Sequence, residues 1–308
     1  MSTAAPALAR FAWMSIAAAL VTMGLKLAAW LLTGSVGFLS DAAESVVNLM
    51  AAVIALVVLR FAAQPPDAEH QYGHEKAEYM AAGVEGALIL LAAASIAWAA
   101  IGRLLNPEPL ENVQVGVTVS AIAAAVNLVV ALRLIRVGRA HRSIALEADG
   151  KHLMADVWTS VGVVAGVAAV GATGWDRLDP IIALAVAANI VVTGYLLIHR
   201  STGGLMDRAL PAADLAAVEA VLDRHRLEGV EFHAIRTRQA GRRSFVSMHV
   251  LVPGAWSVQR GHDLAERVER DVRQAVPHAT VFTHIEPVED PSSFADAGLD
   301  RAGGEGGA

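Results

Sequence analysis

The sequence predicts a membrane protein with two parts: an all-α transmembrane bundle of six helices, and a C-terminal cytoplasmic α+β domain of the ferredoxin or metallochaperone type. Hydrophobic residues make up 55% of the chain, charged residues only 18%, and the mean hydropathy is +0.48. A soluble protein of this length could not carry that balance. Aromatic residues contribute only 5%, so the apolar content is aliphatic, which is typical of closely packed spanning helices rather than of a barrel.

Six apolar runs are each long enough to cross a bilayer, which takes about 20 residues. The first run has no small-residue cleavage site and exceeds the length of a signal-peptide core, so we expect it to be retained. Lys and Arg residues gather at one side of the runs, whereas only Arg103 and Arg177 lie on the other. This asymmetry predicts that both termini are cytoplasmic. The localisation that we expect for this multi-pass protein is the plasma (inner) membrane. The runs cover residues 11–33, 36–62, 80–105, 113–137, 152–173 and 178–198.

After Pro211 the hydrophobic period alternates between that of helices and that of strands. The expected order is αββαβ, with helices at 214–225 and 258–276 and strands at 232–239, 244–252 and 280–286. Two helices against one face of such a sheet form a compact module. We therefore expect a cytoplasmic N-terminus at 1–10, a transmembrane domain at 11–204, a cytoplasmic domain at 205–290 and a disordered, glycine-rich tail at 291–308.

The residue types present restrict the chemistry of any site. The chain has no cysteine, so a transition metal would have to bind imidazole nitrogens and carboxylate or amide oxygens. The net charge is −6 and basic residues form no continuous block, so nucleic acid is not an expected partner.

Ionisable residues interrupt two of the apolar runs. His152 and Asp156 are spaced i and i+4, which places them on one helix face, and Asp41, Glu44 and Asn48 form a stripe on the second run. Such residues cost roughly 2.5 to 3.5 kcal/mol each inside a membrane, so they are expected to face a cavity. Glu44, Asn48, His152 and Asp156 could form a tetrahedral N/O site that suits Zn²⁺ and accepts Fe²⁺, Co²⁺ or Mn²⁺. The alternatives are polar packing between helices and a helix end that reaches water.

Other polar residues in the runs fit interhelical hydrogen bonds better than a metal role. Asn127, Asn189, Ser95 and Thr193 belong to this group. Lys26 and Glu85 are expected to be paired or to face a cavity.

Two further groups of residues have the character of metal ligands. Asp67, His70 and His74 fall within eight positions of one predicted cytoplasmic loop, where solvated surface histidines are the alternative. In the predicted cytoplasmic domain, imidazole and carboxylate recur on the strands and on the second helix, and folding could bring them together at an edge of the sheet. These residues are His233, His249, His262, His284 and Glu286.

Over residues 10–290 the chain resembles the cation diffusion facilitator family, and in particular its bacterial zinc and iron efflux branch. The resemblance is carried by short segments spread along the whole length. They are Thr33-Gly34-Ser35-Val36, the loop 67–78, the segment 149–156, the segment 205–211, Arg236-Thr237-Arg238-Gln239 and His284-Ile285-Glu286-Pro287.

The resemblance implies a divalent metal exporter that works as a homodimer. It implies a transport site at Glu44, Asn48, His152 and Asp156, the loop site at Asp67, His70 and His74, and a binuclear cytoplasmic site at the five residues named above. It also implies charge contacts between Lys76 and Asp207 where two protomers meet. The branch has aspartates where Glu44, Asn48 and Glu286 stand, and Asp41 could supply a further carboxylate one turn away.

A ligand imidazole must be neutral to bind a metal, so release of the ion and protonation of His152 and Asp156 would be linked steps. We therefore expect metal/proton antiport by alternating access, with a divalent transition metal, Zn²⁺ first and Cd²⁺ among the others, both as substrate and as a regulatory ion in the cytoplasmic domain. One alternative is a membrane-embedded metal hydrolase, although the sequence has no HExxH motif. The other is a membrane metal sensor, for which no output module is recognisable.

Overall fold

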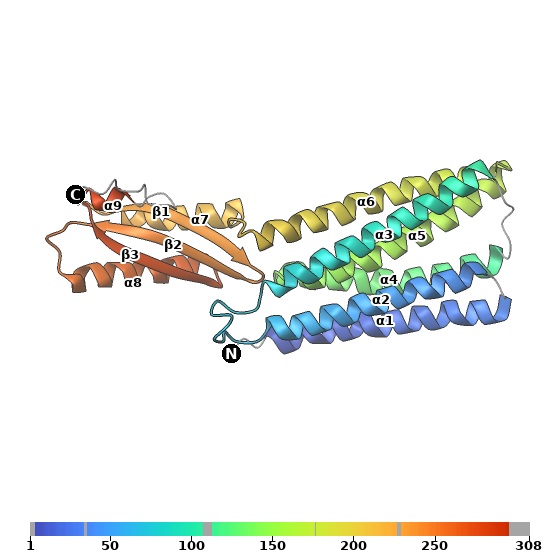
Figure 1. Ribbon diagram of the computed structural model, residues 1–308, viewed down its shortest axis with the longest axis horizontal. Coiled ribbons are helices and arrows are strands. Elements are labelled where there is room, and N and C mark those ends of the chain that lie inside the picture. The colour runs from blue at the N-terminus through green and yellow to red at the C-terminus, as the bar shows by residue number, and fades with distance from the viewer. Residues whose placement is uncertain (1–3, 34–35, 107–112, 176, 227–228, 296–308) are drawn as a thin grey trace, which may run out of the picture. The chain divides into compact units, whose positions relative to one another are not determined.

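The computed structural model describes residues 4–295, apart from 34–35, 107–112, 176 and 227–228. The chain divides into two compact units between Leu205 and Met206 (Figure 1). The first unit is helical and the second contains a small sheet. Each unit has its own core, so each is described by itself.

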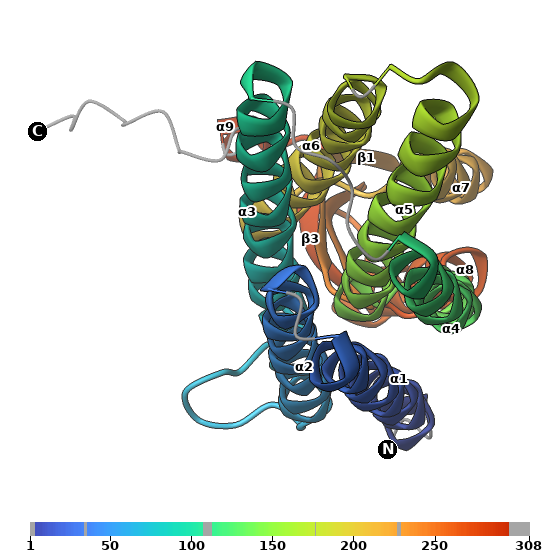
Figure 2. The same ribbon diagram turned by 90° about the vertical axis from the view of Figure 1, so that its right-hand side faces the viewer.

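Long helices run side by side through the first unit (Figure 1), and Figure 2 views them from one end. They associate chiefly as pairs: α3 with α6, α4 with α5, and α1 with α2. In the described residues they are α1 (Ala4–Thr33), α2 (Val36–Ala62), α3 (Ala77–Leu105), α4 (Val113–Ala140), α5 (Ile144–Thr173) and α6 (Leu178–Leu205).

Four of these helices are long and apolar enough, within the described residues, to cross a membrane. The qualifying segments are Leu8–Ala29, Ala77–Leu105, Thr118–Ala140 and Pro180–Leu205, while α2 contributes the shorter apolar stretch Asn48–Ala62. The N-terminal half of α5 is too rich in charge, since it carries Glu147, Asp149, Lys151 and Asp156. Parts of α2 and α5 lie outside the residues with described side chains, and these are the two helices on which the sequence places the candidate ligands.

The pair of α3 and α6 comes into close contact through glycine. A Cβ added at Gly86 would lie 2.7 Å from Cγ1 of Ile198 and 3.3 Å from the Gly194 carbonyl oxygen. A Cβ at Gly194 would lie 2.9 Å from the Leu90 side chain. Small residues let helix backbones approach in this way, and in a membrane such packing is a main source of helix association.

In the second unit, helices cover one face of a three-stranded sheet. Strand β2 (Arg243–Val252) lies in the centre, antiparallel to β1 (Glu231–Ala240) and parallel to β3 (Ala279–Pro287). Alternate β2 residues Val246, Met248 and Val250 are buried against α7 and α8. The element order is the αββαβ order that the hydrophobic periods indicate. The covering helices are α7 (Ala212–His225) and α8 (Val258–Ala275).

Two local features shape the open face of this sheet. The register of β1 against β2 shifts between His233 and Arg236, and Ala234 there has a positive φ of 48°, which marks a β-bulge. Beyond β3, a short helix α9 (Ser292–Ala295) lies within the stretch expected to be disordered. The hydroxyl of Ser293 donates to the Pro287 carbonyl at 2.8 Å, which ties α9 to the end of β3. The rest of that stretch lies outside the described residues.

Replacing Gly86 by leucine should destabilise the membrane unit, because the new side chain collides with Ile198 and the α6 backbone. Overpacking of this kind costs about 1–3 kcal/mol. We expect Gly86→Leu to lower the thermal unfolding midpoint of the detergent-purified protein. The matched control is Gly102→Leu on the same helix, where an added Cβ meets nothing within 4 Å. Equal midpoints for the two variants would contradict this account of the contact.

Candidate metal centres

Asn48, His152 and Asp156 come together inside the helical unit, the first from α2 and the others from successive turns of α5. All three are buried, with 4%, 5% and 8% of their surfaces exposed. The Asn48 amide lies between the other two side chains: its Oδ1 is 2.6 Å from His152 Nε2, and its Nδ2 donates to Asp156 Oδ2. Because an amide oxygen only accepts, the ring proton of His152 sits on Nε2 in this arrangement.

The arrangement leaves lone pairs for a cation. His152 Nδ1 has no hydrogen-bond partner among the described residues. Buried polar atoms are normally satisfied, so an orphaned imidazole nitrogen beside a carboxylate fits a site that receives an ion. Asp41 and Glu44 lie on the same helix as Asn48, but their side chains fall outside the described residues.

Asn127 of α4 is a further member that the sequence interpretation treated only as a packing residue. Its Nδ2 lies 3.3 Å from Asp156 Oδ2, so it makes an interhelical hydrogen bond, but to a candidate ligand. Its Oδ1 has no partner in the described part of the chain. The sequence of α4 does not indicate this contact, because the contact depends on how α4 packs against α5.

The loop between α2 and α3 brings Asp67, His70 and His74 together. Asp67 Oδ2 lies 3.2 Å from His74 Nε2, and Asp67 Oδ1 lies 3.4 Å from His70 Nδ1. One ligand atom from each residue falls within 4.8 Å of the others. His74 is buried and its ring contacts the edge of Phe61 at 4.6 Å, whereas Asp67 and His70 are exposed. The loop therefore holds three candidate ligands, two of them exposed and the third a buried imidazole.

Backbone hydrogen bonds hold the Asp67 carboxylate in place. Its Oδ1 accepts from the backbone N–H of His70 at 2.6 Å and from that of Glu69 at 3.0 Å. The His70 N–H is the main reason that the pKa of Asp67 lies below its usual value. The Asp67 carboxylate therefore stays ionised at lower pH than an ordinary aspartate.

On the open face of the sheet, a row of histidines crosses all three strands. His233 is directly opposite His249 on the antiparallel side, and His249 is opposite His284 on the parallel side. Glu286, two residues after His284, points to the same face. Its Oε2 lies 3.1 Å from His233 Nε2 and 3.0 Å from His249 Nδ1, and its Oε1 lies 3.5 Å from His284 Nε2. The donor set is imidazole and carboxylate, which suits Zn²⁺ and its neighbours.

The structure does not bring His262 into this group. It is exposed on α8, next to Gly261, where an added Cβ would meet Ile285 at 3.4 Å. Because residues alternate along a strand, Ile285 points away from the face that carries His284 and Glu286. Within one protomer, His262 therefore lies on the helix-covered side of the sheet.

Lys76 and Asp207 make other contacts within their own units. The Lys76 ammonium lies 3.5 Å from the Leu205 carbonyl oxygen, and Asp207 accepts from the Arg238 guanidinium at 3.3 Å. Their expected contact between two protomers stays a prediction.

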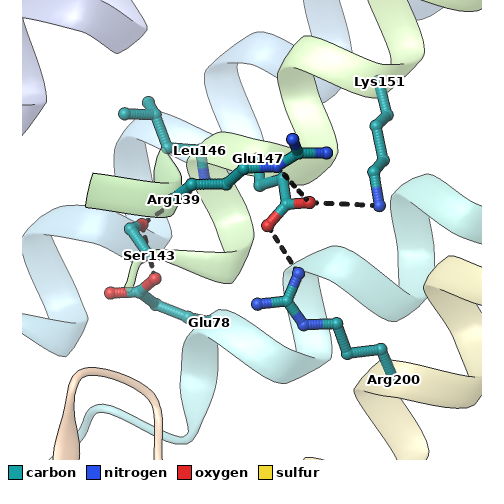
Figure 3. Close-up of polar contacts among 7 residues, drawn as sticks. All are labelled: Glu78, Arg139, Ser143, Leu146, Glu147, Lys151 and Arg200. Atoms are coloured by element: carbon teal, nitrogen blue, oxygen red, sulfur yellow. Dashed lines mark hydrogen bonds and ion pairs between the residues drawn. The ribbon is translucent and has the colours of Figure 1, made fainter. Parts of the chain in front are cut away.

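Glu147 on α5 is the centre of a charged cluster (Figure 3). Its buried carboxylate contacts Arg200 of α6 at 2.5 Å, Lys151 at 3.2 Å and Arg139 of α4 at 3.4 Å. The sequence interpretation counted these three cations as an orientation signal but did not anticipate their common partner. Only the i, i+4 spacing of Glu147 and Lys151 could have indicated part of it.

Ser143 joins this region to α3. Its hydroxyl caps α5 by accepting from the Leu146 N–H at 3.4 Å, and it donates to the buried Glu78 at 2.5 Å (Figure 3). Polar contacts therefore connect α3, α4, α5 and α6 at one end of the helical unit.

Comparison with known proteins identifies two matching family models. Residues 12–206 match the cation efflux transmembrane domain, and residues 210–288 match the cytoplasmic domain of cation efflux proteins. An uncharacterized transporter of Synechocystis sp. is 51% identical over 284 residues, which is 92% of each chain. The cation-efflux pump FieF of Shewanella oneidensis is 32% identical over 89% of this chain and 92% of its own. FieF of Serratia proteamaculans is 33% identical over 88% and 90% respectively.

Two solved structures are similar to a part of the chain. The zinc form of CzrB is 36% identical, with a TM-score of 0.25, and matches 26% of this chain and 92% of its own. The metal-bound C-terminal domain of the CzcD transporter from Thermotoga maritima is 25% identical, with a TM-score of 0.24, and matches 27% and 99%.

Removing the charge of Glu147 should destabilise the helical unit, because three cations would lose their shared partner. Hydrogen bonds to charged groups contribute more than neutral ones, but Arg139 and Arg200 are partly exposed, so we expect a loss of about 1–2 kcal/mol for Glu147→Gln. Thermal unfolding in detergent would measure it. Glu219→Gln, which removes an exposed contact to Arg226 at 3.0 Å, is the control and should change little. If both variants unfold alike, the buried cluster does not stabilise the bundle.

Proposed function

Because the chain belongs to the cation efflux family, we propose that it exports a divalent transition-metal cation from the cytoplasm, with Zn²⁺ as the first candidate substrate. Members of this family are transporters rather than enzymes. The protein is therefore an integral membrane transporter of the cell membrane, and the hydrolase alternative is set aside.

The observation that carries the proposal is the meeting of Asn48, His152 and Asp156 between α2 and α5. Inside the helical unit, the buried amide hydrogen-bonds both the buried imidazole and the buried carboxylate. Buried groups of this kind are costly unless they are paired or receive a cation. We propose that Glu44 completes the site from the preceding turn of α2, with Asp41 as a further carboxylate nearby.

The same packing supports a bundle in which all six long helices cross the membrane. In α5 the N-terminal half, whose side chains are described, carries too much charge to qualify as a span by composition. Its polar residues, however, contact α1, α2, α4 and α6, so they do not need lipid or water as partners. The excess of Lys and Arg at one end of the helices supports cytoplasmic termini.

Exchange for protons follows from the chemistry of the ligands. His152 binds a metal only when one ring nitrogen has a free lone pair, and Asp156 only as a carboxylate. Protons and metal therefore compete for the same atoms. Alternating access then requires that the site load metal on the cytoplasmic side and protons on the other.

We further propose that the loop and sheet clusters are regulatory metal sites of a homodimer. The loop cluster and the group His233, His249 and Glu286 each gather their ligand atoms within 4.8 Å. His284 borders the second group, and His262 would have to approach it by rearrangement or from the partner subunit. In this dimer Lys76 and Asp207 are the proposed charge contact between protomers. A metal sensor without transport is the remaining alternative.

Reconstituted vesicles with an imposed pH gradient test the exchange. We expect Zn²⁺ uptake to follow the proton gradient, and Asp156→Ala to reduce the initial rate on the order of 100-fold, because a metal site loses its carboxylate. Asp263→Ala, on the exposed side of α8, is the control. Uptake that ignores the gradient, or that Asp156→Ala leaves intact, would refute antiport at this site. Binding without any uptake would favour the sensor.

Replacing Asn48 by aspartate should change the selectivity of transport. The substitution adds a carboxylate, and carboxylate-rich sites suit hard cations such as Mn²⁺ better than imidazole-rich sites do. We expect Asn48→Asp to raise Mn²⁺ uptake relative to Zn²⁺ in a competition series that also includes Fe²⁺, Co²⁺ and Cd²⁺. Asn189→Asp, on an exposed position of α6, controls for added charge. An unchanged order of preference would exclude a role for Asn48 in selectivity.

A further inference from the structure

A second group of buried polar side chains lies one turn before His152. It consists of Glu85 on α3, Asp149 on α5 and Ser15 on α1, with exposed fractions of 0%, 1% and 0%. The Ser15 hydroxyl donates to Asp149 Oδ1 at 2.9 Å. Both oxygens of Glu85 and the Oδ2 of Asp149 have no hydrogen-bond partner among the described residues. Three carboxyl oxygens are thus buried without a donor.

Ala82 and Ile89, which flank Glu85 on α3, pack in one buried cluster with Ala148, which adjoins Asp149, and Ala155 on α5, so Glu85 and Asp149 lie on helix segments that contact each other. Two neighbouring buried carboxyl groups without a cationic partner do not both remain ionised, because burial and mutual repulsion both disfavour the second charge. The Ser15 donor favours the charge on Asp149, which leaves Glu85 as the group that holds a proton. A neutral carboxylic acid can also donate, which would satisfy one of the oxygens that now lacks a partner.

Charged groups on the surrounding helices have other partners or lie elsewhere. On α3, Glu78 accepts from Ser143. On α5, Glu147 is held by the cations of Figure 3, one of which is Arg200 of α6. No hydrogen bond or ion pair joins Glu85 or Asp149 to a cationic side chain within residues 4–295 as described. The remaining ionisable side chains on α1 and on the adjoining turns of α5 are Arg10, Lys26, Lys151, His152 and Asp156.

We propose that Glu85 and Asp149 form a proton-binding site inside the helical unit, separate from the metal ligands, which holds one proton in the metal-free protein. Asp149 precedes His152 by three residues and Asp156 by seven, so all three lie on one stripe of α5. The pair can therefore exchange a proton with the metal site over about two helical turns. Its use as a second proton carrier rests on the proposed exchange, whereas proton binding does not.

Infrared difference spectroscopy between acid and alkaline pH tests the proposal on the metal-free, full-length protein. A buried protonated carboxyl gives a C=O stretching band distinct from that of carboxylates. We expect this band in the unmodified protein, its reduction or loss in Glu85→Gln, and its loss in the double variant Glu85→Gln/Asp149→Asn. Both substitutions keep side-chain size and mimic the neutral acid, and elution as a single species would verify folding. The matched control is Glu147→Gln, which removes a buried carboxylate surrounded by cations and should leave the band intact.

A band that neither Glu85→Gln nor the double variant changes would overturn the proposal. Elemental analysis after chelation of the metal sites gives a second test. A stoichiometric cation that is present in the purified protein and disappears with Glu85→Gln would also overturn the proposal, because the pair would then be a cation site. Neither outcome depends on transport. If the vesicles showed no proton-coupled uptake while the band behaved as expected, the exchange mechanism would fail and the proton site would stand.

Discussion

Polar groups enclosed among membrane helices have no water to bind, so they must find partners in the protein. The candidate transport site depends on how the Asn48 amide meets this constraint. One side of the amide receives the His152 N–H, and the other side donates to Asp156. This bridge sets the tautomer of the imidazole, holds the carboxylate and joins α2 to α5. Ser15 with Asp149, and Ser143 with Glu78, apply the same principle between other helices.

The three ligand groups differ in how far they are prepared for an ion. The proposed transport ligands are buried and joined through Asn48, so a cation that binds the Asn48 or Asp156 oxygens must replace those hydrogen bonds, whereas His152 Nδ1 is open to it. The loop cluster has two exposed members and its carboxylate is set by backbone N–H groups. The histidine row is fixed by strand pairing. This difference in preparation is the reason for proposing transport at the first site and regulation at the other two.

Patterns within one element were predictable from the sequence, whereas contacts between elements were predictable only where metal-ligating residue types on two elements indicated a common site. The i, i+4 spacing indicated that His152 and Asp156 share a face, and the alternation of β2 indicated which residues reach the core. The role of Asn127 depended on the packing of α4 against α5. The loop ligands could be predicted because they lie within eight positions of one another. His262 was expected among the sheet ligands because composition carries no information about which face α8 covers.

The bulge at Ala234 determines which way β1 presents its side chains. Side chains alternate with a period of two, so His233 and Arg236, three residues apart, would face opposite sides of a regular strand; the extra residue of the bulge lets both lie opposite β2 residues of one face, His249 and Ser247. His233 lies before the irregularity, and the residues from Arg236 onward lie after it. A deletion of the extra residue would therefore leave His233 opposite His249 in a regular strand, so the row of imidazoles tolerates a one-residue change in chain length at this point. The pairing partner on β2, rather than the number of residues between the two halves of β1, keeps this imidazole in the proposed metal centre.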